Sequence, residues 1–390
     1  MELLNVKNLT IRTGGQMPLV RGSSFYVQPG ETLAIVGESG SGKSLSLLAV
    51  LGLLPDELQI TGEITFNDLP LHTFSPKQKR RLRGAQIGYI SQDPLSNLHP
   101  LKSVGRQIEE AILAHQKLSR KALRTRVESL LDEVGIPNAS ERYLDYPAKF
   151  SGGQRQRITI AMAIALRPKL IIADEPTTAL DATVQATILQ LLKRLQQRYG
   201  CALIFISHNL RVVADIADRV AVMQRGKIVE QGSRNLMFSS PSHTYSQALL
   251  QAGFPPRATS EFKPSTTPLL EVSQLSRHYS LPSLFRKKNS DLTVLNSVSF
   301  TQYKGEIIGL VGESGSGKTT LGRILAGLDG ADSGSVTLNG QLWHLPAPCH
   351  PQRPTVQMIF QDPYSSVNPR RTVSDILAQP LQIPALREHG

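Results

Sequence analysis

The chain has 390 residues, of which 40% are hydrophobic, 19% are charged and two are cysteines. This composition excludes a disulfide scaffold and an intrinsically disordered chain, while a formal net charge of +12 admits nucleic acid, an anionic membrane surface or phosphorylated ligands as partners. No secretion signal opens the sequence, and no apolar run reaches the roughly 20 residues of a membrane-spanning helix, so we expect a soluble or peripheral protein.

The first distinctive segment is "GETLAIVGESGSGKS", residues 30–44. Its apolar run at 31–36 predicts a buried strand, and the glycines that follow lead into a helical pattern. G-x-x-x-x-G-K-[ST] is the P-loop pattern, in which backbone N–H groups and a helix N-terminus hold phosphate oxygens. Lys43 would reach the β and γ phosphates of a nucleotide, and Ser44 would bind Mg²⁺. The predicted nucleotide-binding residues are Gly37, Glu38, Ser39, Gly40, Ser41, Gly42, Lys43 and Ser44.

A basic run, "KQKRRLR", occupies residues 77–83. Charge runs of this kind are usually solvated helix faces. No aromatic residue interleaves with the run, which weakens the alternative of a surface for single-stranded nucleic acid. We therefore expect an exposed helix at this place.

Residues 150–157, "FSGGQRQR", predict a second anion site. A serine and two glycines precede an alanine-rich helical segment at 158–166, so a helix N-terminus and a hydroxyl group would face a ligand. The predicted residues of this site are Ser151, Gly152, Gly153 and Gln154.

Two further apolar runs, "KLIIAD" (169–174) and "ALIFIS" (202–207), predict buried parallel strands separated by a helix over 182–200. The alternation of strands and helices predicts an α/β fold, a P-loop NTPase with a parallel-core sheet flanked by helices. Asp174 and Glu175 follow each other where the first of these strands ends. Nucleotide hydrolysis needs a carboxylate near Mg²⁺ and a group that positions water, which makes Asp174 the candidate metal-side carboxylate and Glu175 the candidate general base.

Self-comparison shows that the chain repeats one module. "GEIIGLVGESGSGKT" (305–319) matches 30–44, "SGSVTLNG" (333–340) matches 61–68, and "FQDPYSSVNP" (360–369) matches 91–100, so the apolar run at 306–311 also predicts a strand. We divide the chain into a complete module at 1–254, a Pro/Ser/Thr-rich linker at 255–268 and the N-terminal part of a second module at 269–390. The second P-loop comprises Gly312, Glu313, Ser314, Gly315, Ser316, Gly317, Lys318 and Thr319, with Thr319 in the Mg²⁺-binding position.

The order of these motifs resembles that of the ATP-binding subunits of ABC transporters. Their P-loop, glutamine loop, signature, Walker B, D-loop and histidine switch are matched in order by Lys43, Gln92, "SGGQ" (151–154), Asp174 with Glu175, "ALD" (179–181) and His208. The resemblance covers essentially the whole chain. It implies an ABC-type ATPase module, repeated with an incomplete second copy, that uses ATP and Mg²⁺ as cofactors.

The resemblance also implies roles for single residues. Gln92 and Gln361 would join both the nucleotide and the Mg²⁺ sites, and His208 would be the switch that contacts the γ-phosphate. Tyr279 is placed to stack on adenine in the second copy. The matching stretch of the first copy, residues 9–15, has no aromatic side chain, so either stacking is weak there or another residue substitutes.

Three stretches, "SQDPLSNLHP" (91–100), "DEPTTALD" (174–181) and "PSHTYSQALL" (241–250), look like the importer group that serves dipeptides, oligopeptides, glutathione or nickel chelates. This similarity implies permease subunits as partners and, through them, a solute-binding protein, at the cytoplasmic face of the bacterial inner membrane. Nucleic acid is then not an expected partner. Two alternatives stay open: a soluble two-module ABC ATPase that acts on ribosomes or nucleic acid, and a remnant that binds nucleotide without turnover.

The second copy departs from the family pattern. In the family, each ATP lies between the P-loop of one module and the signature of another, but the second copy as far as residue 390 has no signature, acid pair or switch histidine. Neither site within one chain would be complete, and the Lys318 site is expected to bind ATP but to hydrolyse it poorly. We expect truncation, by decay of the gene or an incomplete sequence; a real short form would instead pair residues 1–254 of two chains.

Overall fold

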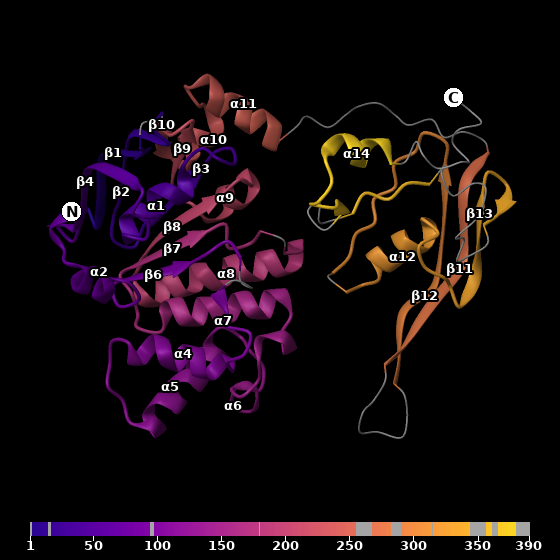
Figure 1. Ribbon diagram of the computed structural model, residues 1–390, viewed down its shortest axis with the longest axis horizontal. Helices are drawn as coiled ribbons and strands as arrows, with labels where there is room; N and C mark the ends of the chain where they lie inside the picture. The colour runs from indigo at the N-terminus through magenta and orange to yellow at the C-terminus, as the bar shows by residue number, and fades with distance from the viewer. Residues whose placement is uncertain are drawn as a thin grey trace. The chain divides into compact units, whose positions relative to one another are not determined.

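The computed structural model describes residues 2–14, 17–93, 97–178, 180–254, 267–281, 290–313, 315–343, 356–360 and 366–379. The chain forms two compact units, Met1–Arg257 (unit 1) and Ala258–Gly390 (unit 2), drawn in indigo to salmon and in orange to yellow (Figure 1). Most of the predicted linker, at 255–266, lies outside the described residues. Within the described ranges, no helix combines the length and the apolar character needed to cross a membrane.

Unit 1 is built around a six-stranded sheet in the order β10-β9-β3-β8-β7-β6. Strands β9, β3, β8, β7 and β6 are parallel, and β10 runs antiparallel to β9. The strands are β3 (Thr32–Val36), β6 (Ile87–Ile90), β7 (Leu170–Asp174), β8 (Ala202–Ser207), β9 (Arg219–Gln224) and β10 (Lys227–Ser233). Every residue of β3, β7 and β8 is buried, because other elements cover both faces of the sheet. The predicted parallel core is therefore confirmed.

A second, antiparallel sheet in the order β2-β1-β4-β5 packs against the main sheet. Its strands are β1 (Leu4–Thr13), β2 (Val20–Val27), β4 (Leu58–Phe66) and β5 (Leu69–Pro70). Buried and less buried side chains alternate along the last part of β2, as in a strand with one covered face. These buried side chains share one hydrophobic cluster with β3 and the helix that follows it, so this sheet supports the P-loop strand from one side.

Helices complete unit 1. The α-helices are α1 (Lys43–Leu51), α2 (Pro76–Leu82), α4 (Val104–Leu113), α5 (Arg120–Glu133), α6 (Ala139–Arg142), α7 (Gly152–Ile164), α8 (Ala182–Tyr199), α9 (Leu210–Ile216), α10 (Arg234–Ser239) and α11 (Thr244–Gly253), with short 3-10 turns at Leu71–Thr73 and Pro147–Lys149. The predicted helix at 182–200 is α8, whereas α7 begins at Gly152, ahead of the expected 158–166. The basic run lies on α2, where Lys77, Arg80 and Arg81 are exposed, as expected.

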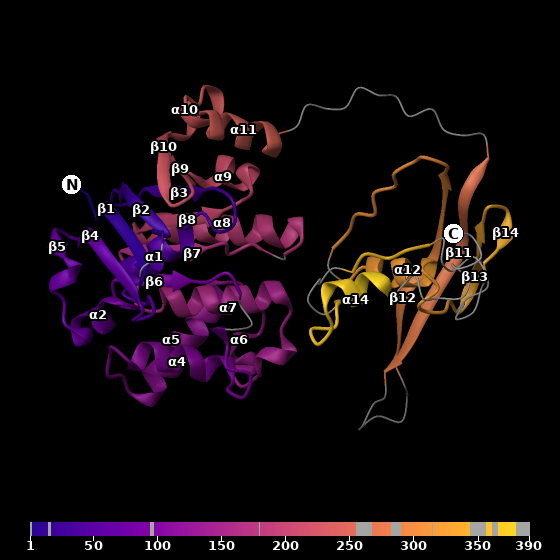
Figure 2. The same ribbon diagram turned by 45° about the horizontal axis from the view of Figure 1, so that its top comes forward.

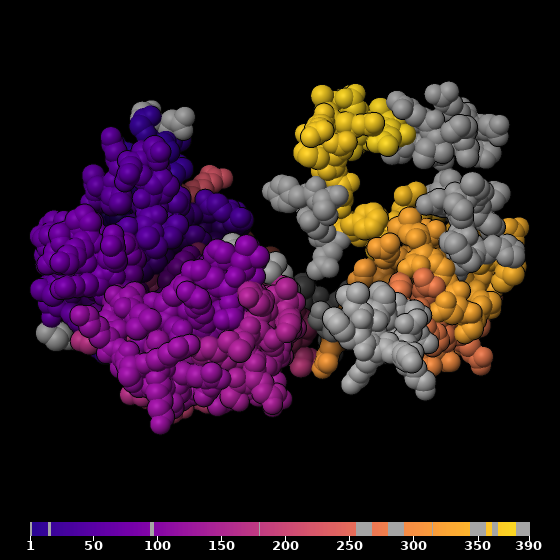
Figure 3. Space-filling view, turned by 60° about the horizontal axis from the view of Figure 1, so that its bottom comes forward, coloured from indigo at the N-terminus to yellow at the C-terminus, as the bar shows by residue number. Residues whose placement is uncertain are grey.

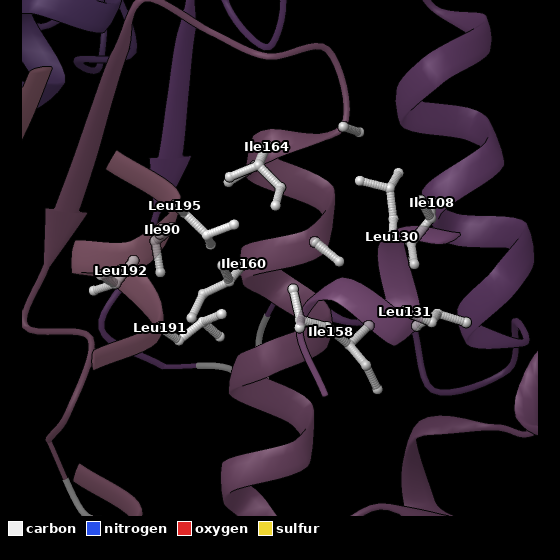
Figure 4. Packing of buried hydrophobic residues seen from close by; sticks show 14 of the residues in the cluster. Ile90, Ile108, Leu130, Leu131, Ile158, Ile160, Ile164, Leu191, Leu192 and Leu195 are labelled. Carbon is white, nitrogen blue, oxygen red and sulfur yellow. The ribbon is translucent and has the colours of Figure 1, made fainter. Parts of the chain in front are cut away.

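The helices α4 to α7 gather at one end of unit 1, in purple to magenta (Figures 1 and 3). Their core is a hydrophobic cluster that also includes side chains of β6 and α8 (Figure 4). Ile158 and Ile160 of α7 lie in the middle of this cluster, with Leu130 of α5 and Leu191 of α8 among their neighbours. The helical region is thus packed onto the same elements that carry the P-loop sheet, rather than attached by a loop alone.

The last helices of unit 1, α9, α10 and α11, lie at the opposite end of that unit from α4 to α7 (Figure 2). Leu210 and Val213 of α9 form a small hydrophobic cluster with Ala34 and Val36 of β3, and with Met237 of α10. Side chains of α11 pack on the same cluster. The segment after the ATPase motifs of unit 1 therefore touches β3, the strand that leads directly into the P-loop of that unit.

Unit 2 repeats the antiparallel sheet of unit 1, in the order β12-β11-β13-β14. Its elements are β11 (Pro268–Leu281), β12 (Ser290–Tyr303), β13 (Ser333–Leu338), β14 (Gln341–Leu342), α12 (Lys318–Leu325) and α14 (Val373–Ala378). Its hydrophobic cluster joins the sheet, through Val272 and Leu275, to Leu321 of α12 and to Trp343.

The prediction of a strand at 306–311 is wrong. These residues are assigned to no strand, and Ile307 and Val311 are 95% and 94% exposed. Their counterpart β3 is hydrogen-bonded to β8 on one side and β9 on the other. The described part of unit 2 has no counterparts of β8 and β9, so the apolar run has no strands with which to pair its backbone groups.

Candidate functional site

The P-loop of unit 1 connects the end of β3 to the start of α1. Two of its glycines are required by the geometry. Gly37 has φ +152°, and a Cβ there would lie 2.1 Å from the backbone oxygen of Met223; Gly42 has φ +100° and faces the side chains of Met223 and Val20. The loop can therefore curl closely against β9 and β2 only with glycine at these positions.

The Lys43 ammonium group is folded back into this loop. Its Nζ atom donates hydrogen bonds to the carbonyl oxygens of Gly37 and Glu38, both at 2.8 Å, and lies 3.4 Å from the hydroxyl oxygen of Ser41. Burial lowers the pKa of Lys43, while the nearby carboxylates of Glu175 and Asp174 oppose that shift. The ammonium is thus held by neutral acceptors in a desolvated place, where negatively charged phosphate oxygens would bind it more strongly.

Asp174 ends β7 and is 4% exposed. Its Oδ1 atom accepts a hydrogen bond of 3.0 Å from the hydroxyl group of Ser44, and the Tyr89 hydroxyl also donates to this carboxylate. Burial raises the pKa of Asp174, and burial together with the Asp174 charge raises the pKa of Tyr89 to about 12. A carboxylate and a hydroxyl oxygen side by side are ligands that Mg²⁺ prefers, and a cation would offset the cost of the buried charge.

Glu175 is the meeting point of three polar side chains from separate segments. Its Oε2 atom accepts hydrogen bonds from Gln92 Nε2 at 3.1 Å and from Thr178 Oγ1 at 2.9 Å, and it lies 3.2 Å from Nδ1 of His208. Glu175 has φ +48°, an uncommon backbone state for a non-glycine residue that turns the chain directly after β7. The Glu175 side chain is 14% exposed and that of His208 is 61% exposed, so solvent can reach this pair of side chains.

The structure brings six predicted residues of unit 1 together: Lys43, Ser44, Gln92, Asp174, Glu175 and His208. They meet because β3, β8, β7 and β6 are adjacent parallel strands, whose carboxyl ends lie at one edge of the sheet. Sequence reasoning missed Tyr89 and Thr178. Their places in the sequence could have indicated both residues, since Tyr89 belongs to the strand just before Gln92 and Thr178 belongs to the "DEPTT" segment itself.

The signature segment is organised around the start of α7. Ser151 Oγ accepts from the Gln154 N–H at 3.3 Å, and the Gln154 side chain accepts from the Ser151 N–H at 3.1 Å, which is a reciprocal helix cap. Gly153 packs against α8 so closely that a Cβ would lie 2.4 Å from Val184 Cγ1. Ser151 and Gly152 are exposed, and among the described residues no hydrogen bond joins them to the P-loop cluster of the same unit.

The P-loop of unit 2 has the same local form. Lys318 Nζ donates to the carbonyl oxygens of Gly312 at 2.7 Å and Glu313 at 2.6 Å, and to the hydroxyl of Ser316 at 3.2 Å. Gly315 and Gly317 have positive φ angles, and Thr319 is exposed in the first turn of α12. Ser314 and Gln361 lie outside the described residues, as does Ala179 of the first module.

Tyr279, the predicted adenine-stacking residue, lies on β11. Its hydroxyl group donates a hydrogen bond of 2.7 Å to Asp329, and the Arg277 guanidinium lies 4.8 Å from the centre of its ring. Arg277 also forms ion pairs with Asp329 and Asp332. The ring is therefore held in a polar network whose cation covers part of the surface that stacking would use.

Comparison with known proteins gives a consistent result. The ABC transporter family profile matches residues 20–178 and 295–388. The chain is 40% identical to the glutathione import ATP-binding protein GsiA of Escherichia coli O6:H1, over 99% of this chain and 68% of that protein. It is 42% identical to the uncharacterized ABC transporter ATP-binding protein YejF of Escherichia coli K12, over 98% of this chain and 73% of that protein.

Solved structures agree. CbiO1 of Clostridium perfringens, part of the ABC transporter complex cbiONQ, is 30% identical with a TM-score of 0.55, over 61% of this chain and 91% of that one. The ATP-binding cassette MJ0796, in a dimeric post-hydrolysis state bound to ADP and Pi, is 26% identical with a TM-score of 0.53, over 59% of this chain and 98% of that one. The chain belongs to the ATP-binding proteins of the ABC transporter family and is an ABC-type ATPase.

Proposed function

We propose that this chain hydrolyses ATP to drive a bacterial ABC importer of peptides or related small solutes. The observation that carries the proposal is the convergence of Gln92, Thr178 and His208 on one oxygen of Glu175, beside the Lys43 and Asp174 cluster. The similarity to a glutathione import protein over nearly the whole chain supports a small peptide as the solute, since glutathione is a tripeptide.

In the proposed mechanism, Lys43 keeps its hydrogen bond to the Gly37 carbonyl and turns its other N–H donors to the β and γ phosphate oxygens of ATP. Ser44, Asp174 and Gln92 would hold Mg²⁺, which neutralises charge on the phosphates when bound. Glu175 positions the attacking water and accepts its proton, while its hydrogen bonds to Gln92 and Thr178 fix the carboxylate. His208, exposed beside Glu175, would contact the γ-phosphate.

A complete site needs the signature of a second module opposite this cluster. We propose that two modules pair head to tail, so that Ser151 and the glycines after it face the nucleotide of the partner. The exposed N-terminus of α7 supports this arrangement, and the similar cassette MJ0796 is a dimer. Residues 1–254 contain every motif that such pairing requires, and they are the proposed dimerisation module. In the 390-residue chain the Lys318 site is proposed to bind ATP without efficient turnover.

The partner surface is proposed to lie in the helical region of unit 1. Leu101, Leu144 and Tyr146 are 79%, 65% and 50% exposed. Backbone hydrogen bonds from the Val104 N–H to Asp145 and from the Gly105 N–H to Tyr143 bring their two segments together. Exposed apolar side chains gathered in this way are typical of a protein-docking surface. We assign it to permease subunits, which would hold the chain at the cytoplasmic face of the inner membrane and link it to a solute-binding protein.

The decisive variant is Glu175→Gln, which keeps the side-chain shape and removes the base. We expect ATP hydrolysis to fall at least about 100-fold, the lower range for loss of a general base, while ATP binding persists. Glu63→Gln, an exposed residue of β4, is the matched control and should hydrolyse ATP like the parent. Phosphate release and nucleotide titration measure the two quantities. Undiminished turnover in Glu175→Gln would disprove the assignment of the base.

The importer assignment has its own test. The tagged chain is purified from detergent-solubilised membranes of its source cells, and the proteins retained are identified by mass spectrometry. Permease subunits in stoichiometric amounts support the proposal. Ribosomes or RNA in their place would contradict it and favour the soluble ABC class.

A further inference from the structure

Helix α11 is fastened at its start to the edge of the main sheet. The carboxylate of Glu230, on β10, accepts hydrogen bonds from the backbone N–H groups of Ser242 at 2.7 Å and His243 at 3.1 Å. The His243 ring accepts from the Tyr245 N–H at 3.1 Å and caps the helix. These contacts fix the position of the first turn of α11, which carries the Tyr245 side chain.

The Tyr245 side chain reaches the P-loop. Its ring packs on the hydrophobic cluster that contains Ala34 and Val36 of β3, so it is half buried and held in place. Its hydroxyl oxygen accepts a hydrogen bond of 3.1 Å from the backbone N–H of Glu38, the second residue of the P-loop. A helix that follows all the ATPase motifs of unit 1 thus contacts the phosphate loop of that unit directly.

Tyr245 and Lys43 bind opposite ends of the same backbone peptide group. The Glu38 N–H and the Gly37 carbonyl belong to the same planar trans peptide group and point in opposite directions. Tyr245 holds the N–H end of this group, while Lys43 Nζ donates to its carbonyl end at 2.8 Å. Because Gly37 has no Cβ, this peptide group could otherwise rotate and turn its carbonyl away from the lysine.

The second P-loop shows what happens without such a contact. Lys318 binds the carbonyl of Gly312 at 2.7 Å, so the same loop form arises from the local sequence. Among the described residues of unit 2, no side chain is hydrogen-bonded to the Glu313 N–H. The tyrosine is therefore not needed to create the loop. It can bias the orientation of one peptide group within a loop that already exists.

We propose that Tyr245 is a positioning residue of the nucleotide site, which holds the Gly37–Glu38 peptide group in the orientation that binds Lys43 and ATP. The inference rests on the proposed role of Lys43 at the phosphates. It assigns a task to the "PSHTY" segment: α11 couples the end of unit 1 to the phosphate loop through one hydroxyl group. Removal of that hydroxyl lowers the population of the binding-competent loop, and so it weakens ATP binding.

The test compares two Tyr→Phe variants of the full chain, each made with Lys318→Ala so that the second P-loop adds no binding. Tyr245→Phe removes the hydroxyl at the loop and keeps the ring in its cluster. Tyr199→Phe is the matched control, because its hydroxyl is bonded at 2.7 Å to Glu133 and the residue precedes β8, at the opposite end of that strand from His208. The dissociation constant for MgATP is measured with a fluorescent ATP analogue, and turnover at saturating ATP by phosphate release.

For Tyr245→Phe we expect a dissociation constant raised about 2- to 10-fold, the change that one hydrogen bond of ordinary net strength carries, with turnover at saturating ATP nearly unchanged. Tyr199→Phe should bind MgATP like the parent. Equal affinities of the two variants would overturn the proposal, and so would reduced turnover with unchanged affinity. If the parent shows no ATP binding that depends on Lys43, the proposed function fails first and this inference falls with it.

Discussion

The two P-loops of this chain have nearly the same sequence and different surroundings. Seven of the eight residues are identical between 37–44 and 312–319, and in both loops the lysine binds the same two backbone carbonyls and the same serine. Yet the strand before the first loop is buried between β8 and β9, while Val311 before the second is 94% exposed. The local form of a P-loop is thus encoded in its own residues, and its chemistry is supplied by its neighbours.

The neighbours differ in charge as well as in packing. Lys43 is 5% exposed and lies near the carboxylates of Asp174 and Glu175, whereas Lys318 is more exposed and has no acid pair beside it in the described part of unit 2. In such a cluster the buried ammonium group can bind phosphate oxygens, and the carboxylates beside it can bind a metal ion. The comparison therefore supports the proposal that catalysis belongs to unit 1, and matched substitutions in the two units can test it.

The largest contrast is expected between Lys43→Ala and Lys318→Ala. Lys43→Ala should reduce ATP hydrolysis at least about 100-fold, because it removes a preorganised cation from the phosphates. Lys318→Ala should retain most of the turnover, although it loses one nucleotide-binding site. Phosphate release and the number of bound nucleotides per chain measure the two effects. An equal loss of turnover in both variants would show that the two P-loops contribute alike and would end the asymmetry.

The sequence predicted the parallel core and the main site residues because both depend on local patterns. A short apolar run bounded by polar residues, such as 202–207, indicates a strand buried on two faces. The motif residues then meet because the carboxyl ends of adjacent parallel strands share one edge of the sheet. The strand at 306–311 could not be judged in this way, since a strand also needs neighbours for its backbone. Contacts of Tyr89, Thr178 and Tyr245 depend on tertiary register, which no local pattern contains.

The second contrast uses the identical residues Val36 and Val311, which hold matching positions before the two loops. Val36→Ala should lower the free energy of unfolding of unit 1 by about 2 kcal/mol, from lost hydrophobic burial plus the cavity left behind, since Val36 is 1% exposed. Val311→Ala should change the stability of unit 2 by less than about 0.5 kcal/mol, as for other exposed substitutions.

The two units can be followed separately in one denaturant titration. Trp343 is the sole tryptophan of the sequence and is 3% exposed in the core of unit 2, so its fluorescence reports that unit, while far-UV circular dichroism is dominated by the helices of unit 1. Val36→Ala should shift the dichroism transition and leave the tryptophan transition in place. A loss of stability in Val311→Ala comparable to that of Val36→Ala would show that the run at 306–311 is buried in solution.

The smallest expected effect concerns Asp174, a buried carboxylate that the unit 1 site has and the described part of unit 2 lacks. Burial raises the pKa of Asp174 in the folded protein, so the folded state favours the protonated form, and stability is lost as pH rises through the folded pKa. Asp174→Asn should therefore be more stable than the parent at pH 7 without nucleotide, by about 1 kcal/mol, the usual scale for relief of a destabilised functional group.

That gain should shrink as pH falls through the ordinary aspartate pKa of about 4, because below that pH the parent carboxyl is protonated in both the folded and the unfolded state. Thermal unfolding across this pH range measures it, with Asp56→Asn, an exposed aspartate, as a control that should show no such trend. Added MgATP should make the parent the more stable of the two proteins. It stabilises the parent by binding, whereas Asp174→Asn lacks the metal-side carboxylate and should bind MgATP more weakly. A variant that is less stable than the parent at pH 7, or one that MgATP stabilises equally, would contradict the view that this buried charge is kept for nucleotide chemistry at the cost of stability.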